Sequence, residues 1–255
     1  MRKMQAYFLT AVLLSASACA GRATAPSTAA APAAKSFNAY LSQGIADMER
    51  GDYRQATDNL RTAVKMAPDS SKAHNYLGLC YFRQRGYDPA KEEFQRAAAL
   101  DPSNATAYNN LAGVLSIKQD FAGAENMYRK ALGLAPDLVS ANYSLGVLLA
   151  NLGKTEEGIG YLSRGIALDP QYLETHMDMV TMSSSVAFDM KETYFTYAKA
   201  YASAGEVDKA VEYLAKAREA GFFDWPRILK EREFEKVRAD PRIKEFLKAP
   251  AGPIV

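Results

Sequence analysis

The stretch "ATAYNNLAGVLSIKQDFAGAENMYRKALGLAPDL" (residues 105–138) decides the fold, because its pattern recurs through most of the chain. The proline near its end belongs to an evenly spaced series: Pro68, Pro102, Pro136 and Pro170. Other positions keep the same register, in the columns Ala56, Ala90, Ala124 and Gly158, and Leu60, Phe94, Tyr128 and Leu162. A period of this length is typical of a small structural unit that stacks on its neighbours.

The spacing inside one unit predicts two helices. Tyr108, Leu111, Ala112 and Leu115 recur at the interval of one helix face, and a second apolar stripe runs through Phe121, Ala124, Tyr128 and Ala131. A polar break around residues 119–120 separates the two stripes. We therefore expect antiparallel helix pairs, each ended by a proline, which cannot continue a helix.

The second unit carries the residues of a known repeat: His74, Leu77-Gly78, Tyr81, Ala90, Phe94, Ala97 and Pro102. This pattern resembles the tetratricopeptide repeat. The resemblance implies an all-α fold, a right-handed superhelical solenoid of antiparallel helix pairs that presents a binding surface for protein or peptide partners.

The repeats predict the organisation of the chain. Four units occupy 37–172, at 37–70, 71–104, 105–138 and 139–172, and a fifth occupies 191–224. The interruption at 173–190 fits an extra helix with a Ser-rich loop or a degenerate half-repeat. Residues 225–255 are expected to form a C-terminal capping helix region and tail, with Trp225 packed beneath the cap.

The segment 1–18 resembles a signal peptide, with Arg2 and Lys3 ahead of an apolar stretch. The following "ASAC" (16–19) resembles the lipobox of bacterial lipoproteins, which implies lipid attachment at Cys19 and anchoring to the outer membrane, facing the periplasm. The alternative is a plain signal peptide cut after Ala18 or Ala20, giving a soluble periplasmic or secreted protein. Residues 19–36 are rich in Ala, Pro, Ser and Thr, and we interpret them as a flexible tether.

Composition offers no support for nucleic-acid binding. The chain has 31 basic and 29 acidic residues, so without Arg2 and Lys3 the count becomes 31 − 2 = 29 against 29. The sequence contains no motif that predicts a catalytic, cofactor or metal site. In particular, the two distant histidines cannot build a multi-His metal site. Cys80 is expected to be a buried, inert thiol.

The interruption at 173–190 supports an alternative function. Met177, Met179 and Met182 are clustered thioethers, which are ligands for Cu(I), and His176 is adjacent. An envelope enzyme or copper-binding protein with its site at 173–190 is therefore the rival hypothesis. The competing interpretation of these methionines is core packing.

In the tetratricopeptide family the first helices line the concave side of the solenoid, and the matching positions form our candidate partner-binding groove. Side-chain amides there have donors and acceptors for the backbone of an extended peptide. The alternative is a solvated wall without a ligand. The candidate residues are Asn75, Phe82, Arg83, Asn109, Asn110, Ile117, Tyr143 and Asn151.

The sequence thus predicts an exported, lipid-anchored scaffold that is not an enzyme. Pilotin lipoproteins, which help assemble type IV pilus secretins, also join a lipobox to stacked tetratricopeptide units. That resemblance suggests a role in assembling an envelope, pilus or secretion complex. Tetratricopeptide domains that capture a C-terminal carboxylate need Lys or Arg across three successive first helices. The matching positions here hold Asn75 with Leu79, Asn110, and Ser140 with Ser144, so only the central Asn is kept and such capture is not expected.

Overall fold

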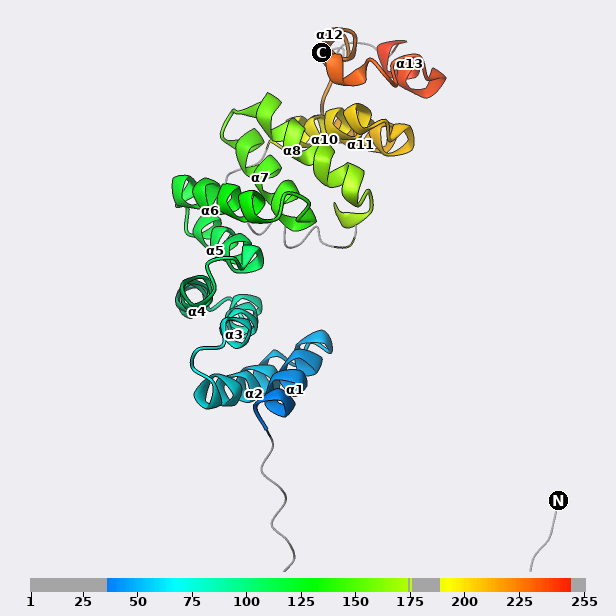
Figure 1. Ribbon diagram of the computed structural model, residues 1–255. Helices are drawn as coiled ribbons and strands as arrows, with labels where there is room; N and C mark the ends of the chain where they lie inside the picture. Colours follow the sequence, from blue (N-terminus) through cyan, green and yellow to red (C-terminus); the bar gives the residue numbers. More distant parts are fainter. Residues whose placement is uncertain (1–35, 174, 176–188, 249–255) are drawn as a thin grey trace, which may run out of the picture. The chain divides into compact units, whose positions relative to one another are not determined.

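The computed structural model describes residues 36–173, 175 and 189–248, and every regular element in these ranges is a helix (Figure 1). Eight of the helices form four consecutive pairs stacked in chain order. The pairs are α1 (Phe37–Glu49) with α2 (Tyr53–Met66), α3 (Ser71–Arg83) with α4 (Tyr87–Leu100), α5 (Ala105–Ile117) with α6 (Phe121–Leu134), and α7 (Val139–Asn151) with α8 (Thr155–Leu168).

The period of the sequence is the period of the backbone. The first helices of the pairs begin at residues 37, 71, 105 and 139, and the second helices at 53, 87, 121 and 155, so the starts recur at the interval of the prolines. Side-chain caps fix several of these starts. Ser70 Oγ accepts from Ala73 N at 3.2 Å, and Asn104 Oδ1 accepts from Ala107 N at 3.0 Å. The all-helical prediction is confirmed.

A fifth pair follows the interruption. It consists of α10 (Met190–Ala204) and α11 (Val207–Glu219), and α10 packs against α8. Gly205 ends α10 with φ of 89°, the left-handed conformation that glycine adopts without steric cost. The boundary of the interruption at Leu173 is a buried core position.

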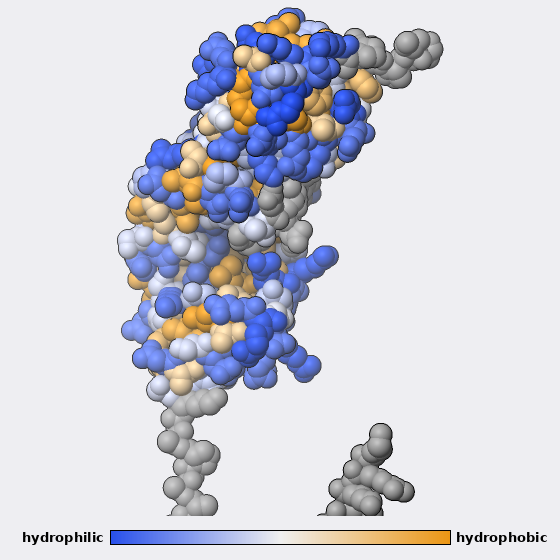
Figure 2. Space-filling model, turned by 90° about the vertical axis from the view of Figure 1, so that its right-hand side faces the viewer, coloured by the Kyte–Doolittle hydropathy of each residue, from blue (hydrophilic) through white to orange (hydrophobic). Residues whose placement is uncertain are grey.

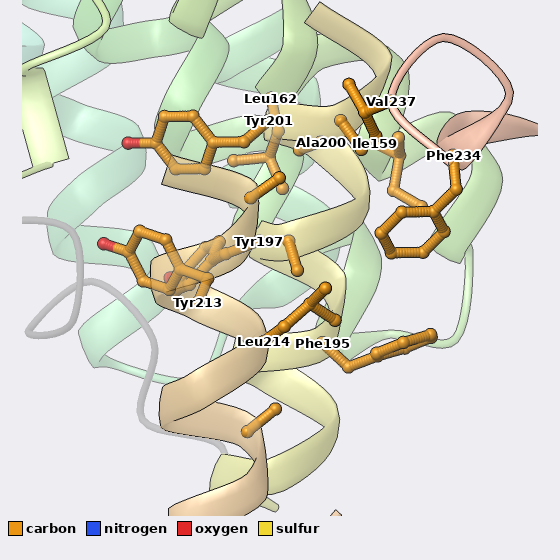
Figure 3. Close-up of a cluster of buried hydrophobic side chains, with 14 of the residues drawn as sticks. Ile159, Leu162, Phe195, Tyr197, Ala200, Tyr201, Tyr213, Leu214, Phe234 and Val237 are labelled. Carbon is orange, nitrogen blue, oxygen red and sulfur yellow. The ribbon is translucent and has the colours of Figure 1, made fainter. Parts of the chain in front are cut away.

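Aromatic side chains join the fourth pair, the fifth pair and the cap (Figure 3). Tyr201 and Tyr213 stack with ring centroids 5.2 Å apart and point their hydroxyl groups to the same side. Phe195 stacks on Phe222, the residue that replaces the proline of the repeat, at 4.2 Å. This aromatic cluster packs the fifth pair against the fourth pair on one side and against the cap on the other.

The cap consists of short helices, α12 (Arg227–Lys230), η1 (Arg232–Phe234) and α13 (Pro241–Lys248). Trp225 is 1% exposed and lies 5.1 Å from the Phe246 ring, so the prediction that it packs under the cap is confirmed. Lys199 of α10 donates to Glu231 at 2.7 Å and ties the cap to the fifth pair. Leu229 on the single-turn helix α12 is 53% exposed, whereas its neighbour Ile228 is buried.

Several sequence predictions fall outside the described residues. These are the signal peptide, Cys19, most of the tether, and His176, Met177, Met179 and Met182 of the interruption. Among the helices that are described, none has the length and apolar character to cross a membrane. Hydrophilic side chains cover most of the face shown in Figure 2, with separate hydrophobic patches between them.

Candidate partner-binding groove

Three of the predicted groove residues form a chain of side-chain amides on α3 and α5. Asn110 Nδ2 donates to Asn75 Oδ1 at 3.0 Å, and Asn109 Nδ2 lies 3.4 Å from Asn110 Oδ1. The chain ends at Asn109 Oδ1, which is buried and has no hydrogen-bond partner among the described residues. A carbonyl oxygen in that state favours a ligand that brings an N–H or O–H group.

A small pocket of about 30 Å³ lies beside this amide chain. Its walls come from α3, α4, α5, α6, α7 and the residues that follow α8. They combine apolar, hydroxyl and amide groups: Leu79, Phe82, Phe94, Asn109, Asn110, Gly113, Tyr128, Ser140, Ser144 and Tyr172. The helical repeat places all but the last of these, so the pocket belongs to the groove between the second, third and fourth units.

Tyr172 is the groove residue that the repeat pattern did not reveal. It follows α8, outside the first-helix positions, and its ring stacks on that of Tyr143 at 5.0 Å. Burial raises the pKa of Tyr172, while its contacts with Ser140 and the positive charge of Arg83 act in the opposite direction. Tyr172 and Ser140 both line the groove pocket, so this contact joins the segment after α8 to the first helix of the fourth unit.

Asn151 lies at a second pocket, of about 220 Å³, between α7, α8 and α10. Its Nδ2 is buried and has no hydrogen-bond partner among the described residues. Glu192 and Arg227 line the same pocket and pair with each other at 2.9 Å. The structure thus separates Asn151 from the amide chain, although both are on the first helices.

Two of the predicted contact residues are core residues instead. Tyr143 is 0% exposed, and its hydroxyl donates to Asp169 O at 2.9 Å, so it positions Tyr172 rather than meeting a partner. Phe82 is 5% exposed and packs edge-on against Tyr87 at 5.9 Å, leaving only its rim in the pocket wall. At both positions the aromatic ring turns inward, so Tyr143 has no surface for a partner, whereas contact of a partner with Phe82 at the pocket wall stays a prediction.

The remaining predicted residues sit at the ends of their helices. Arg83 is exposed in the last turn of α3, and Ile117 is half-buried at the end of α5, where it packs on the core of the second and third units. Each is displaced from the amide chain along its helix. They flank the groove rather than line the pocket.

His74 and Cys80, the other two residues weighed for a chemical role, have structural environments. His74 is 7% exposed, with Nδ1 2.6 Å from Glu93 Oε2 and Nε2 3.0 Å from Pro68 O. Cys80 is buried as predicted, and burial raises the pKa of its thiol to about 11, which favours the protonated form. Among the described residues, no group of His, Cys, Asp and Glu is arranged to hold a metal ion.

Models of known protein families also identify the tetratricopeptide repeats in this sequence. A tetratricopeptide repeat model matches residues 41–105, 81–137 and 118–172, and a second one matches 191–219. The chain belongs to the tetratricopeptide repeat family. Proteins built from this repeat are scaffolds for protein interactions, and so is this one. No curated protein matches the chain.

Solved structures of tetratricopeptide repeat proteins share the fold. PilF of Pseudomonas aeruginosa is 19% identical, with a TM-score of 0.54 over 83% of this chain and 96% of PilF. A thermophilic tetratricopeptide repeat protein of Thermus thermophilus is 20% identical, with a TM-score of 0.52 over 84% of this chain and 100% of its own. MamA is 21% identical, with a TM-score of 0.50 over 77% and 95%.

Proposed function

We propose that this tetratricopeptide repeat protein is an exported, lipid-anchored scaffold that docks an extended segment of an envelope protein in the groove between α3, α5 and α7. The observation that carries the proposal is the amide chain from Asn75 through Asn110 to Asn109, with an open acceptor at its end. An extended peptide has unpaired backbone N–H groups, and one of them satisfies Asn109 Oδ1.

The character of the groove favours a neutral ligand. The pocket beside Asn109 is lined by apolar, hydroxyl and amide side chains and by no charged residue. Its small volume suits a small apolar side chain next to the hydrogen-bonded peptide group. Affinity then comes from backbone hydrogen bonds and apolar burial rather than from ion pairs, so binding is expected to change little with salt.

Export and anchoring rest on the N-terminal sequence, with its apolar stretch and "ASAC" at 16–19. We propose that lipid on Cys19 holds the protein at the outer membrane and that the tether lets the repeat region reach partners in the periplasm. The combination of "ASAC" with stacked tetratricopeptide units, which resembles pilotin lipoproteins, supports a place in the assembly of a pilus or secretion complex.

The groove is tested by replacing Asn109 with Ala and measuring recovery of co-purified envelope proteins by quantitative mass spectrometry. We expect at least tenfold lower recovery of the specific partner, because the bound peptide group loses its acceptor. Asn126→Ala is the matched control, since Asn126 is exposed on α6 and lies outside the pocket. Equal recovery with Asn109→Ala and Asn126→Ala would refute the groove.

Anchoring is tested separately by fractionating cells that express the Cys19→Ala chain. We expect the variant to leave the membrane fraction while its repeat region stays folded. If it remains in the membrane fraction, the lipid-anchor part of the proposal is wrong, and the groove is unaffected.

A further inference from the structure

The fourth unit departs from its neighbours at one structural position. The column Tyr40, His74, Tyr108 has a large ring in the first three units, and the fourth unit has Asn142. Asn142 is 0% exposed and lines a pocket of about 340 Å³ between α6, α7 and α8. Asn142 therefore has no ring at the position where the first three units have one, and its side chain forms part of the wall of this pocket.

Comparison with the second unit shows which contact is missing. His74 uses both ring nitrogens, one toward Pro68 O and the other toward Glu93. Asn142 repeats the first contact, since its Nδ2 donates to Pro136 O at 2.9 Å. The residue equivalent to Glu93 two repeats later is Tyr161, in the same register that relates Asn142 to His74.

In the fourth unit the second contact is not made. The Tyr161 hydroxyl accepts from Arg129 Nη1 at 3.2 Å, and Asn142 Oδ1 is left buried without a hydrogen-bond partner among the described residues. A buried acceptor without a partner costs about 1–3 kcal/mol. A ligand that brings a donor to this oxygen recovers that cost.

The walls of the pocket define the ligand. Leu132 and Pro136 are apolar, and the Tyr161 ring offers an aromatic surface. Arg129 and Arg164 also line the pocket, and their positive charges disfavour a cationic donor such as a lysine or arginine side chain. A neutral ring with an N–H or O–H group fits this lining, because the ring packs on the apolar and aromatic side chains and the polar group can donate to Asn142 Oδ1.

Access to the pocket is compatible with a side chain that enters from outside. Arg164 is 53% exposed and is held by one surface ion pair, to Asp137 at 2.9 Å. Surface pairs of this kind contribute about 0–1 kcal/mol, so Arg164 can move aside at low cost. The pocket shares no residue with the groove pocket.

From these observations we infer that the pocket between α6, α7 and α8 is a second docking site, which receives an exposed tryptophan or tyrosine side chain of a partner protein. The inserted ring takes the place that Tyr108 and His74 fill in the preceding units. Its N–H or O–H group donates to Asn142 Oδ1. The inference does not depend on the groove or on lipid attachment.

The test is a titration of the full chain with N-acetyl-tryptophanamide and with N-acetyl-phenylalaninamide, followed by the NMR shifts of the Asn142 side-chain amide. We expect the indole probe to bind at least tenfold more tightly than the phenyl probe, which brings no donor. Equal affinities, or shifts confined to other residues, would overturn the inference.

Two variants block the site by different routes. Asn142→His restores the ring of the second unit, and Gly133→Leu adds a side chain at the pocket wall, where a Cβ on Gly133 meets nothing within 4 Å. Both are expected to lose binding of the indole probe. Gly160→Leu on α8 is the control, because a Cβ there also has open space and Gly160 does not line this pocket. Unchanged binding in a folded Gly133→Leu chain would contradict the site, and the preference between probes in the unmodified chain tests it independently of any variant.

Discussion

Asn110 Nδ2 donates a hydrogen bond to Asn75 Oδ1 at 3.0 Å, which joins the first helix of the third unit to the first helix of the second. Asn75 is 7% exposed, so this bond is shielded from water. The same pair orients Asn109, whose Oδ1 is the open end of the amide chain. One contact thus supports both the stacking of the repeats and the geometry of the groove.

The first prediction concerns the strength of this link. A double-mutant cycle of Asn75→Ala and Asn110→Ala, read as the free energy of unfolding in urea, should give a coupling energy of about 1 kcal/mol. The exposed Asn126, replaced by Ala, should show no coupling with Asn75→Ala. Additive effects of Asn75→Ala and Asn110→Ala would mean that the bond contributes nothing to stacking.

The second prediction concerns the close approach of α7 and α8. A Cβ on Gly158 would lie 2.6 Å from Gly146 O and 2.8 Å from Ala150 N, both backbone atoms that cannot turn away. Gly158→Ala should lower the free energy of unfolding by about 2 kcal/mol. Gly160→Ala, on the same helix with open space around its Cβ, should raise it by about 0.5–1 kcal/mol. Similar effects of the two substitutions would rule out close packing as the cause.

The third prediction concerns Cys80. Because burial raises the pKa of its thiol to about 11, the native Cys19→Ala chain should react with a thiol reagent at pH 8 only as fast as it unfolds. Urea at a concentration that unfolds the chain should restore the rate of a free thiol. Rapid labelling of the folded chain at pH 8 would show that Cys80 is accessible.

The fourth prediction concerns alkaline pH. Burial raises the pKa of Tyr213 to about 12, from an ordinary value of 10, and raises the pKa of Tyr143, Tyr197 and Tyr201 as well. The native state therefore binds these protons more tightly than the unfolded state, so this stability is complete below pH 10 and is lost between pH 10 and 12. The melting temperature should fall steeply across that window, with less loss in Tyr213→Phe. A flat profile from pH 10 to 12 would contradict the burial of these phenols.

The repeat could be predicted from the sequence because the same spacing of proline, small and large apolar residues recurs in successive units. The proline marks the end of a helix, and the small residue marks a place where two helices approach closely. The helix starts of the structure recur at the same interval as these residues. The amides of the groove could also be predicted, since Asn75, Asn109 and Asn110 follow from their positions on the first helices.

The direction in which an aromatic ring points could not be predicted in this way. Tyr143 and Phe82 occupy groove positions, yet their rings fill the core because burying an aromatic surface is more favourable than exposing it. Tyr172 and the pocket at Asn142 were missed for a related reason. Each depends on contacts between different units, and the repeat pattern describes the residues within one unit.

The most direct test of the account is photocrosslinking in living cells with a photoreactive amino acid at residue 144 or at residue 126. Ser144 lines the groove pocket, whereas Asn126 is exposed on α6 outside it. We predict a discrete crosslinked partner from residue 144 that disappears when Asn109→Ala is added, and no such product from residue 126. Equal crosslinking from both positions, or crosslinking from residue 144 that Asn109→Ala leaves unchanged, would contradict docking in the groove.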